Sequence, residues 1–432
     1  MVWFEKLKLN KQLVRSVNEA GFTNPKELQQ KTLTRIIGGQ DIIVIGPEGS
    51  GKTTTYVLGV LNRFNYAPEG VPRVLILVPE KEQVEAVMQQ FELLNKNRSI
   101  SIVGLYVTPG IEAQMDALAD GADIVVATPD RARAIYLKLG LNLNKIDLFI
   151  IDDADLMIKK GMQLPVTELA NSITKCQHLV FTEVMHNKLE KMIAPFMKLP
   201  ATIEVEELEE TPIQTHQQLL YHVPNFGTKL NLLNLFMYDD ELFTKTVVFV
   251  NTNATADKLY KGLQSRLRDA VAVLNPRFFD THGFKTIEDF KAASHSRILI
   301  AANENNESID LVGIPFLIHF DLPVEKELYI ARVTNHQPDS EDETMAITFA
   351  TDLELSQVKK IEQATGKKIP TASLPDELVI EKEVKAKKEE EKPTKPSADA
   401  PGAAFHEKKA ANAKTYNYSS GQKAKMNNKR KH

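Results

Sequence analysis

The stretch that decides the fold is Ile42-Ile43-Val44-Ile45-Gly46-Pro47-Glu48-Gly49-Ser50-Gly51-Lys52-Thr53. Its first four residues are β-branched and apolar, which is typical of a buried strand. The residues after it repeat apolar side chains on one helical face: Val57, Val60, Leu61 and Phe64. A strand, a glycine-rich turn and a helix are the context in which G-x-x-x-x-G-K-S/T binds phosphate, because the glycines let backbone N–H groups point at the phosphate oxygens. A surface turn without chemistry is the alternative, and the strand and helix on either side disfavour it.

The residue types in this loop predict a site for a nucleoside triphosphate. Lys52 would reach the β- and γ-phosphates, and the Thr53 hydroxyl would ligate Mg²⁺. The nucleotide-binding residues that we expect are Gly46, Pro47, Glu48, Gly49, Ser50, Gly51, Lys52, Thr53 and Thr54.

The composition is that of an ordinary globular protein. A length of 432 residues predicts two or three domains, and 43% hydrophobic and 25% charged residues are usual for such chains. No apolar run reaches the length of a bilayer crossing, and the first residues lack the pattern of a secretory signal. The single cysteine, Cys176, excludes an internal disulfide. We therefore expect a cytoplasmic protein.

Apolar runs alternate with helical patterns from Asp41 onward. We expect strands at residues 42–45, 74–78, 102–106, 124–127, 148–151 and 179–181, and again at 246–250, 297–301, 316–320 and 345–349. Several of these runs are continuously apolar, as in strands that are buried on both faces. The pattern predicts an α/β fold of two lobes, each a mostly parallel sheet flanked by helices, with ligands at the carboxyl ends of the strands.

Two helices are expected before the first strand. Asn10 would cap a helix that Gly21 stops. Asn24, Pro25 and Glu27 fit the N-cap, the first helical position and the glutamate of a capping box in the second helix.

A glutamate-rich segment near residues 205–212 separates the two lobes. We predict a first domain over residues 1–205, a second over residues 206–370, and a charged, then basic, disordered tail over residues 371–432. Residues 401–432 carry a net charge of +7, so the rest of the chain carries −11. Lysines and aromatic residues in this tail suit contacts with phosphates and unpaired bases, and a tail that only adds solubility is the alternative.

Three aspartates follow another expected strand, in Ile150-Ile151-Asp152-Asp153-Ala154-Asp155. Such a run alone would more often be a solvated turn or a helix cap. In a chain with a phosphate-binding loop, Asp152 is the natural Mg²⁺ partner of Thr53, and Asp153 is placed to orient or deprotonate water. The expected catalytic residues are therefore Lys52, Asp152 and Asp153.

The run Asp152-Asp153-Ala154-Asp155 resembles the D-E-A-D box of the DEAD-box RNA helicases, a family of superfamily 2. Other stretches follow the order of that family's motifs over roughly residues 4–350. The resemblance implies two RecA-like lobes that bind ATP and Mg²⁺ between them and single-stranded or locally unwound RNA across them. It also implies that Phe4 stacks on adenine and Gln29 bonds to its edge. Asp310 and Arg332 stand at ATP-binding positions of the second lobe.

Three loops are similar to the stretches with which that family grips RNA. The family motif P-T-R-E corresponds to Pro79-Glu80-Lys81-Glu82, and the motif T-P-G-R corresponds to Thr128-Pro129-Asp130-Arg131. Gly110 corresponds to one glycine of a Gly-Gly turn in the family. The RNA-binding residues implied are Pro79, Lys81, Gly110, Thr128 and Arg131. Glu80 places a negative charge beside the expected phosphates, so the grip looks weakened, and plain strand-to-helix loops are the alternative.

Departures from the family pattern grow toward the second lobe. Thr182-Glu183-Val184 stands at S-A-T, and the segment 302–310 keeps only the final Ile-Asp of its motif. Asn335 and Pro338 replace two arginines that in the family reach the triphosphate. An arginine finger contributes about 10³- to 10⁵-fold to turnover, and Asp153 is one methylene shorter than glutamate. We therefore expect ATP binding to persist and hydrolysis to be slow or lost.

Two other functions fit these residues. The first is a nucleotide-gated RNA clamp or scaffold that does not hydrolyse ATP, which the second-lobe departures favour. The second is a P-loop ATPase that acts on a protein partner, which the acidic body and the altered RNA loops favour. The partner that we expect is RNA, and ribonucleoprotein partners are possible in addition.

Overall fold

The computed structural model describes residues 7–63, 70–108, 110–206, 212–305, 309–335 and 344–381. Phe4, Pro338 and the expected basic tail lie outside these residues, so their predictions stay predictions. None of the described helices combines the length and the apolar character that crossing a membrane requires.

The first lobe, residues 7–206, is built on a sheet of seven parallel strands in the order β3-β4-β2-β5-β6-β1-β7. Its strands are β1 (Ile42–Ile45), β2 (Val74–Leu77), β3 (Ile102–Leu105), β4 (Ile124–Ala127), β5 (Leu148–Ile151), β6 (Gln177–Thr182) and β7 (Ala201–Glu204). All strands but β3 and β7 are buried along their whole length, which explains their continuous apolar runs.

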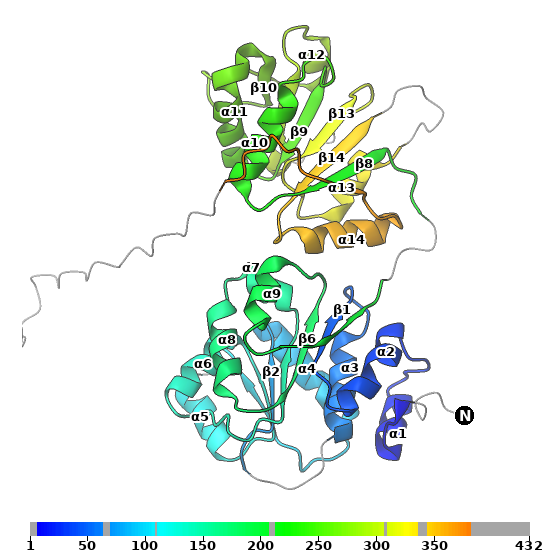
Figure 1. Ribbon diagram of the computed structural model, residues 1–432, viewed down its shortest axis with the longest axis vertical. Helices are drawn as coiled ribbons and strands as arrows, with labels where there is room; N and C mark the ends of the chain where they lie inside the picture. Colours follow the sequence, from blue (N-terminus) through cyan, green and yellow to red (C-terminus); the bar gives the residue numbers. More distant parts are fainter. Residues whose placement is uncertain are drawn as a thin grey trace, which may run out of the picture. The chain divides into compact units, whose positions relative to one another are not determined.

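Helices cover both faces of this sheet (Figure 1). One face carries α1 (Lys11–Glu19), α2 (Glu27–Ile37), α3 (Lys52–Arg63) and α4 (Lys81–Leu94). The other carries α5 (Ile111–Ala119), α6 (Pro129–Leu137), α7 (Ala154–Lys159), α8 (Gln163–Ser172) and α9 (Asn187–Ile193).

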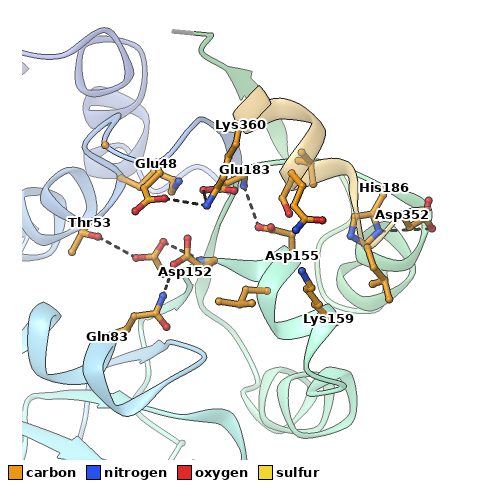
Figure 2. Close-up of a pocket in the computed structure, with 18 of the residues that line it drawn as sticks. Glu48, Thr53, Gln83, Asp152, Asp155, Lys159, Glu183, His186, Asp352 and Lys360 are labelled. Atoms are coloured by element: carbon orange, nitrogen blue, oxygen red, sulfur yellow. Dashed lines mark hydrogen bonds and ion pairs between the residues drawn. The ribbon is translucent and has the colours of Figure 1, made fainter. Parts of the chain in front are cut away.

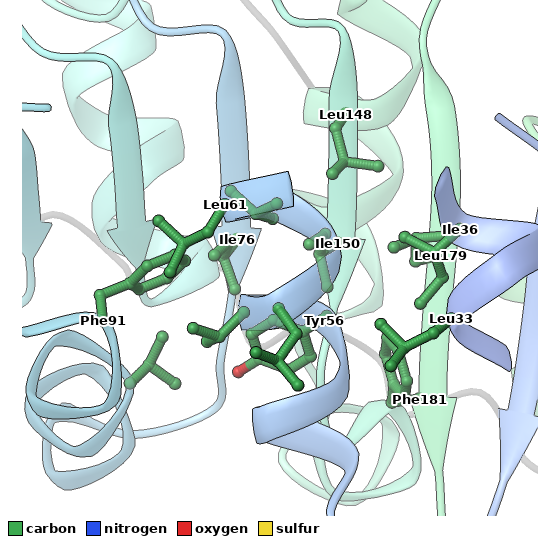
Figure 3. Close-up of a cluster of buried hydrophobic side chains, with 14 of the residues drawn as sticks. Leu33, Ile36, Tyr56, Leu61, Ile76, Phe91, Leu148, Ile150, Leu179 and Phe181 are labelled. Carbon is green, nitrogen blue, oxygen red and sulfur yellow. The ribbon is translucent and has the colours of Figure 1, made fainter. Parts of the chain in front are cut away.

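The pleat of each strand divides its side chains between two cores. In β1, Ile42 and Val44 face the core under α1–α4, whereas Ile43 and Ile45 face the other core. Tyr56 of α3 lies in the first core with its ring centroid 5.3 Å from that of Phe181 (Figure 3). This packing fixes the start of α3, and with it the phosphate-binding loop, against the centre of the sheet.

The second lobe, residues 212–381, contains a sheet of eight parallel strands in the order β11-β10-β12-β9-β13-β14-β8-β15. Its strands are β8 (Gln217–His222), β9 (Thr246–Val250), β10 (Val271–Leu274), β11 (Gly283–Phe284), β12 (Ile298–Ala302), β13 (Phe316–His319), β14 (Met345–Ala350) and β15 (Thr371–Ala372). Two parallel sheets flanked by helices are the predicted fold class, which is confirmed as two RecA-like domains.

Helices also flank the second sheet. One core is closed by α10 (Phe226–Met237) and α11 (Asn253–Leu267). The other is closed by α12 (Ile287–Ala292), α13 (Lys326–Val333) and α14 (Leu355–Thr365). Short 3₁₀ turns occupy Arg268–Ala270 and Asn303–Asn305.

The structure corrects two sequence-based boundaries and adds five strands. The second sheet continues past residue 370, because β15 pairs with β8 and Leu378 is buried in the core beneath α10 and α11. Helix α2 begins at Glu27 rather than after an Asn24 cap, because the Gln29 side chain accepts a hydrogen bond from the Lys26 N–H at 3.1 Å and so caps the helix start. The strands β7, β8, β10, β11 and β15 were not predicted.

Candidate active site

The strand order brings the candidate site residues to one edge of the first sheet. The phosphate-binding loop follows β1, Asp152 follows β5 and Glu183 follows β6, and these three strands are neighbours. The three loops expected to bind RNA follow β2, β4 and β3, which form the adjacent half of the same sheet. We call the part of this edge at β5, β6 and β1 the nucleotide half, and the part at β3, β4 and β2 the proposed RNA half. The two halves meet between β5 and β2.

The phosphate-binding loop has the backbone that its glycines predict. Gly49 and Gly51 adopt φ values of +82° and +89°, which side chains with a Cβ rarely adopt. The Lys52 ammonium donates to the carbonyl oxygens of Gly46 and Pro47 at 2.9 and 3.0 Å, so it lies inside the loop. Since α3 begins at Lys52, its positive end points at the same space.

Thr53 and Asp152 come together as the sequence predicts for a Mg²⁺ site. The Thr53 hydroxyl donates to Asp152 Oδ2 at 3.3 Å (Figure 2). The buried Tyr56 hydroxyl donates to the same oxygen at 2.9 Å. Burial raises the pKa of Asp152, so a nearby cation would favour its charged form. The described residues contain no group of three or more metal-binding side chains. Mg²⁺ fits such a pair, because it binds through one or two oxygen ligands, water and substrate phosphates.

Asp153 has a special backbone and a special partner. Its φ of +49° places it in the left-handed region, where short polar side chains are tolerated. Its Oδ2 accepts a hydrogen bond of 2.6 Å from Gln83 Nε2 of α4. Burial, and then the neighbouring Asp152, raise the pKa of Asp153 to about 7. A carboxylate with a pKa near neutrality is suited to accept a proton from water.

Asp155 connects the aspartate run to the end of β6. Its Oδ1 accepts hydrogen bonds from the Thr182 hydroxyl at 2.8 Å and from the Glu183 N–H at 3.1 Å. The segment Thr182-Glu183-Val184 therefore keeps a hydroxyl contact to the aspartate run. No pattern in the sequence indicates this contact.

A cavity of about 550 Å³ opens at this edge (Figure 2). Its lining includes the phosphate-binding loop, the three aspartates, Glu183 and Lys360 of α14. The Lys360 ammonium lies 3.1 Å from Glu48 Oε2 and 3.6 Å from Glu183 Oε1. Burial raises the pKa of Glu183, whereas the hydrogen bond from Lys360 lowers the pKa of Glu48. The lining of the cavity thus gains two carboxyl groups, from Glu48 and Glu183, and one ammonium group, from Lys360.

Gln29 lies beside the phosphate-binding loop. It is buried, and a Cβ built on Gly51 would lie 3.2 Å from Gln29 Nε2. A role next to a bound nucleotide, which the resemblance implied, is compatible with this position.

The loops expected to bind RNA are tied to one another. Arg131 Nε donates to the Tyr106 carbonyl at 2.8 Å, and its Nη2 donates to the Val107 carbonyl. The Lys81 ammonium lies 5.5 Å from the centroid of the Tyr106 ring. Thr128 is the N-cap residue of α6 and Gly110 that of α5, while Pro79 is buried. Glu80 is paired with Lys160, so part of its negative charge is compensated.

Comparison with known proteins identifies the family. A profile described as "DEAD/DEAH box helicase" matches residues 26–210, and one described as "Helicase conserved C-terminal domain" matches residues 228–334. Together they cover well over half of the chain. The chain belongs to the DEAD-box helicases.

Its relatives among these helicases are distant. The chain is 26% identical over 384 residues to RNA helicase CrhR of Synechocystis, covering 88% of this chain and 76% of that protein. It is 26% identical over 361 residues to ATP-dependent RNA helicase eIF4A of Chaetomium globosum, covering 83% of this chain and 89% of that protein. A crystal structure of a DEAD box protein from the hyperthermophile Methanococcus jannaschii is 23% identical, with a TM-score of 0.48, over 86% of this chain and 99% of that chain.

The two second-lobe positions that resemble ATP-binding residues of the DEAD-box family do not line the cavity. Asp310 is exposed and pairs with Lys291 at 3.1 Å. The Arg332 guanidinium stacks over the Phe249 ring, with its carbon 3.7 Å from the ring centroid. Its Nη2 donates to Asn303 Oδ1 at 2.8 Å. Arg332 is therefore engaged within its own lobe.

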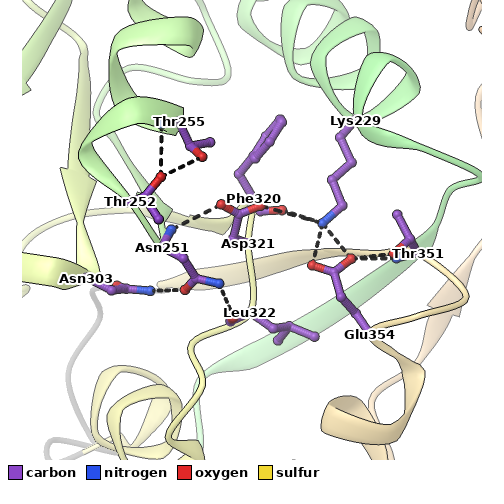
Figure 4. Close-up of polar contacts among 10 residues, drawn as sticks. All are labelled: Lys229, Asn251, Thr252, Thr255, Asn303, Phe320, Asp321, Leu322, Thr351 and Glu354. Carbon is purple, nitrogen blue, oxygen red and sulfur yellow. Dashed lines mark hydrogen bonds and ion pairs between the residues drawn. The ribbon is translucent and has the colours of Figure 1, made fainter. Parts of the chain in front are cut away.

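Arg332 donates to Asn303, which belongs to a polar network at the carboxyl ends of the second-lobe strands (Figure 4). Asn303 donates to Asn251 Oδ1 at 2.8 Å, and the Asn251 N–H donates to Asp321 Oδ2 at 3.1 Å. The buried Lys229 ammonium lies 2.7 Å from Glu354 Oε2 and 3.9 Å from Asp321 Oδ1. Asn303 and Asn251 thus link Arg332 to Asp321, which lies beside this lysine.

Arg332 has no carboxylate partner among the described residues. Burial lowers the pKa of Arg332 to about 9, and its Nη1 is buried without a hydrogen-bond partner. In the part of the chain that the structure describes, Asn303 Oδ1 is the one side-chain acceptor that holds the guanidinium. We expect Asn303→Leu to lower the free energy of unfolding of the second lobe by about 2 to 3 kcal/mol, because a buried charge loses its acceptor.

Urea unfolding measures this loss, and hydrogen exchange of the β12 and β13 amides assigns it to the second lobe. Asn303→Asp is the matched control. It keeps an acceptor for Arg332 but loses the amide N–H that donates to Asn251 Oδ1, so its stability is expected to lie between those of Asn303→Leu and the wild type. Equal stability of Asn303→Leu and the wild type would show that Asn303 does not support the guanidinium.

Proposed function

We propose that this chain is an ATP-dependent RNA-remodelling protein that binds ATP and Mg²⁺ at the edge of the first sheet, binds RNA across the loops beside that edge, and turns ATP over slowly. Lys52 would hold the β- and γ-phosphates, while Thr53 and Asp152 would hold the metal. Asp153 would orient the attacking water. Bound Mg²⁺ would supply charge compensation for the phosphates.

One observation carries the proposal. The phosphate-binding loop, which ends in Thr53, and the segment that carries Asp152 are distant in sequence, and they bring two oxygen ligands together beside a lysine that lies inside the loop. This is the arrangement that positions a triphosphate and its metal. RNA is the expected partner because the relatives in the family are named RNA helicases, and because Lys81 and Arg131 place positive charge along the adjacent half of the edge.

The slow turnover is inferred from what is missing. Asn335 cannot neutralise the charge that develops on a γ-phosphate, and Arg332 is engaged with Phe249 and Asn303. Since an arginine finger contributes about 10³-fold or more and enzymes commonly turn over at about 10 s⁻¹, we expect a rate near or below ~10⁻² s⁻¹.

Phosphate release with and without single-stranded RNA tests this function, together with binding of a fluorescent ATP analogue. The wild type is expected to bind the analogue with Mg²⁺ and to release phosphate slowly, and faster with RNA. Lys52→Ala should lose both the binding and the release. Absence of nucleotide binding by the wild type would contradict the proposal, and a rate near 10 s⁻¹ would contradict its slow-turnover part.

A nucleotide-gated RNA clamp without hydrolysis is the second candidate. The engagement of Arg332 within its own lobe favours it. RNA affinity that rises with ATP and Mg²⁺, in the absence of any phosphate release, would select the clamp.

A further inference from the structure

Gln83 lies where the nucleotide half and the proposed RNA half of the first-lobe edge meet. It belongs to α4, which begins at Lys81 directly after the loop that follows β2. Asp153 follows β5, and β2 pairs with β5 in a register that places Leu77 opposite Ile151. The sheet therefore brings two residues 70 positions apart into direct contact.

The contact is short and has a defined direction. Gln83 Nε2 donates to Asp153 Oδ2 at 2.6 Å, and both side chains line the cavity (Figure 2). Since a carboxylate only accepts hydrogen bonds, the amide nitrogen must face Asp153. This bond fixes one oxygen of a carboxylate whose backbone is already fixed in the left-handed region.

Fold stability does not explain an amide at this position. The other amide atom, Gln83 Oε1, is buried without a hydrogen-bond partner. Leaving a buried acceptor unpaired costs free energy, so an apolar side chain of similar size would suit the fold at least as well. Among the described residues, the one side-chain hydrogen bond of Gln83 goes to Asp153, the carboxylate that would orient the attacking water in the proposed function.

The same helix start is linked to the expected RNA contacts. Lys81, two residues before Gln83, lies against the Tyr106 ring, and Glu80 pairs with Lys160 at the end of α7. Since α7 begins directly after Asp153, the loop after β2 and the first turn of α4 together contact both ends of the segment 153–160, through Glu80 and Gln83. A shift of this loop on binding a phosphate backbone would therefore reach Asp153 through a rigid helix turn.

We propose that Gln83 is a positioning residue that holds the Asp153 carboxylate and couples it to RNA bound at the loop after β2. This inference rests on the proposed function. It predicts that Gln83 affects how strongly RNA accelerates phosphate release, and that it affects nucleotide affinity little.

The test compares Gln83→Met with the wild type in the full chain, using a single-stranded oligonucleotide of uridines. The ratio of the phosphate release rates with saturating and without RNA is measured, together with KM for ATP and Kd for the RNA. We expect the ratio to fall about tenfold while KM and Kd stay within twofold, as for a misplaced catalytic group. Gln83→Glu, which places a second carboxylate against Asp153, should lower the ratio further.

Gln90→Met is the matched control. Gln90 lies two turns along the same helix, does not line the cavity, and also has a buried amide atom without a partner, Nε2. The control should keep the wild-type ratio. An unchanged ratio in Gln83→Met, or an equal fall in Gln90→Met, would overturn the inference. If the wild type binds no ATP, the proposed function itself fails, and this outcome is separate because nucleotide binding is measured first.

Discussion

Asn335→Arg combined with Pro338→Arg is expected to raise RNA-stimulated phosphate release by at least tenfold, and by up to about 10³-fold if both guanidinium groups reach the triphosphate. The reason is electrostatic, because negative charge on the γ-phosphate grows toward the transition state and an amide cannot neutralise it. The backbone at Asn335 is already held, since its N–H donates to the Gln214 carbonyl at 3.0 Å. A new side chain would therefore start from a fixed anchor at the end of α13.

Stopped-flow phosphate release with saturating ATP and RNA measures this gain. Asn335→Gln is the matched control, because it lengthens the side chain without adding charge, and it should leave the rate unchanged. Lys52→Ala in the arginine background should abolish the gained activity. A double-arginine variant that binds ATP as tightly as the wild type and hydrolyses it no faster would show that these positions do not limit turnover.

The fold could be predicted largely because its strands are buried on both faces. Ile42–Ile45 and Leu148–Ile151 are runs of apolar residues without a polar one, and each is buried throughout. Such a run indicates a buried strand from its composition alone. The missed strand β7 (Ala201–Glu204) is an edge strand with an alternating pattern, and it runs directly into the glutamate-rich segment. The missed strand β8 carries two glutamines, since its burial is only partial. Propensity is weakest where a strand is exposed on one side. Exposure does not explain the miss of β10 (Val271–Leu274), which is buried along its whole length.

The candidate site divides in the same way. The phosphate-binding loop and the Asp152 run were found because each is local in sequence and each follows a strong strand. The sequence did not assign Gln83, Glu183 and Lys360 to the site. The places of Gln83 and Glu183 depend on the order of the strands in the sheet. Lys360 lies on a helix more than 300 residues away from the loop, as its pair with Glu48 shows. No local pattern marks a glutamine on α4 as the partner of Asp153. The engagement of Arg332 with Asn303 likewise depends on contacts that only the folded lobe reveals.

Asp153→Glu is the second change with a large expected effect. It lengthens the carboxylate by one methylene at the position where the DEAD-box motif has glutamate. Since a displacement of about 1 Å in a reacting group can cost roughly 100-fold, we expect turnover with RNA to rise by about ten- to 100-fold, with KM for ATP unchanged. Asp153→Asn, which keeps the size and removes the charge, should lower turnover by at least about 100-fold.

The structure adds a condition to this prediction. Gln83 Nε2 lies only 2.6 Å from Asp153 Oδ2, with which it forms a hydrogen bond. The longer glutamate side chain would extend into this space, so Gln83 must shift. Gln83→Met should therefore have a smaller effect in the Asp153→Glu background than in the wild type, and a double-mutant cycle on the rate with RNA measures the difference. If Asp153→Glu is instead slower than the wild type, the short carboxylate held by Gln83 is already the productive arrangement. The weak step would then lie in the second lobe, where arginines are missing.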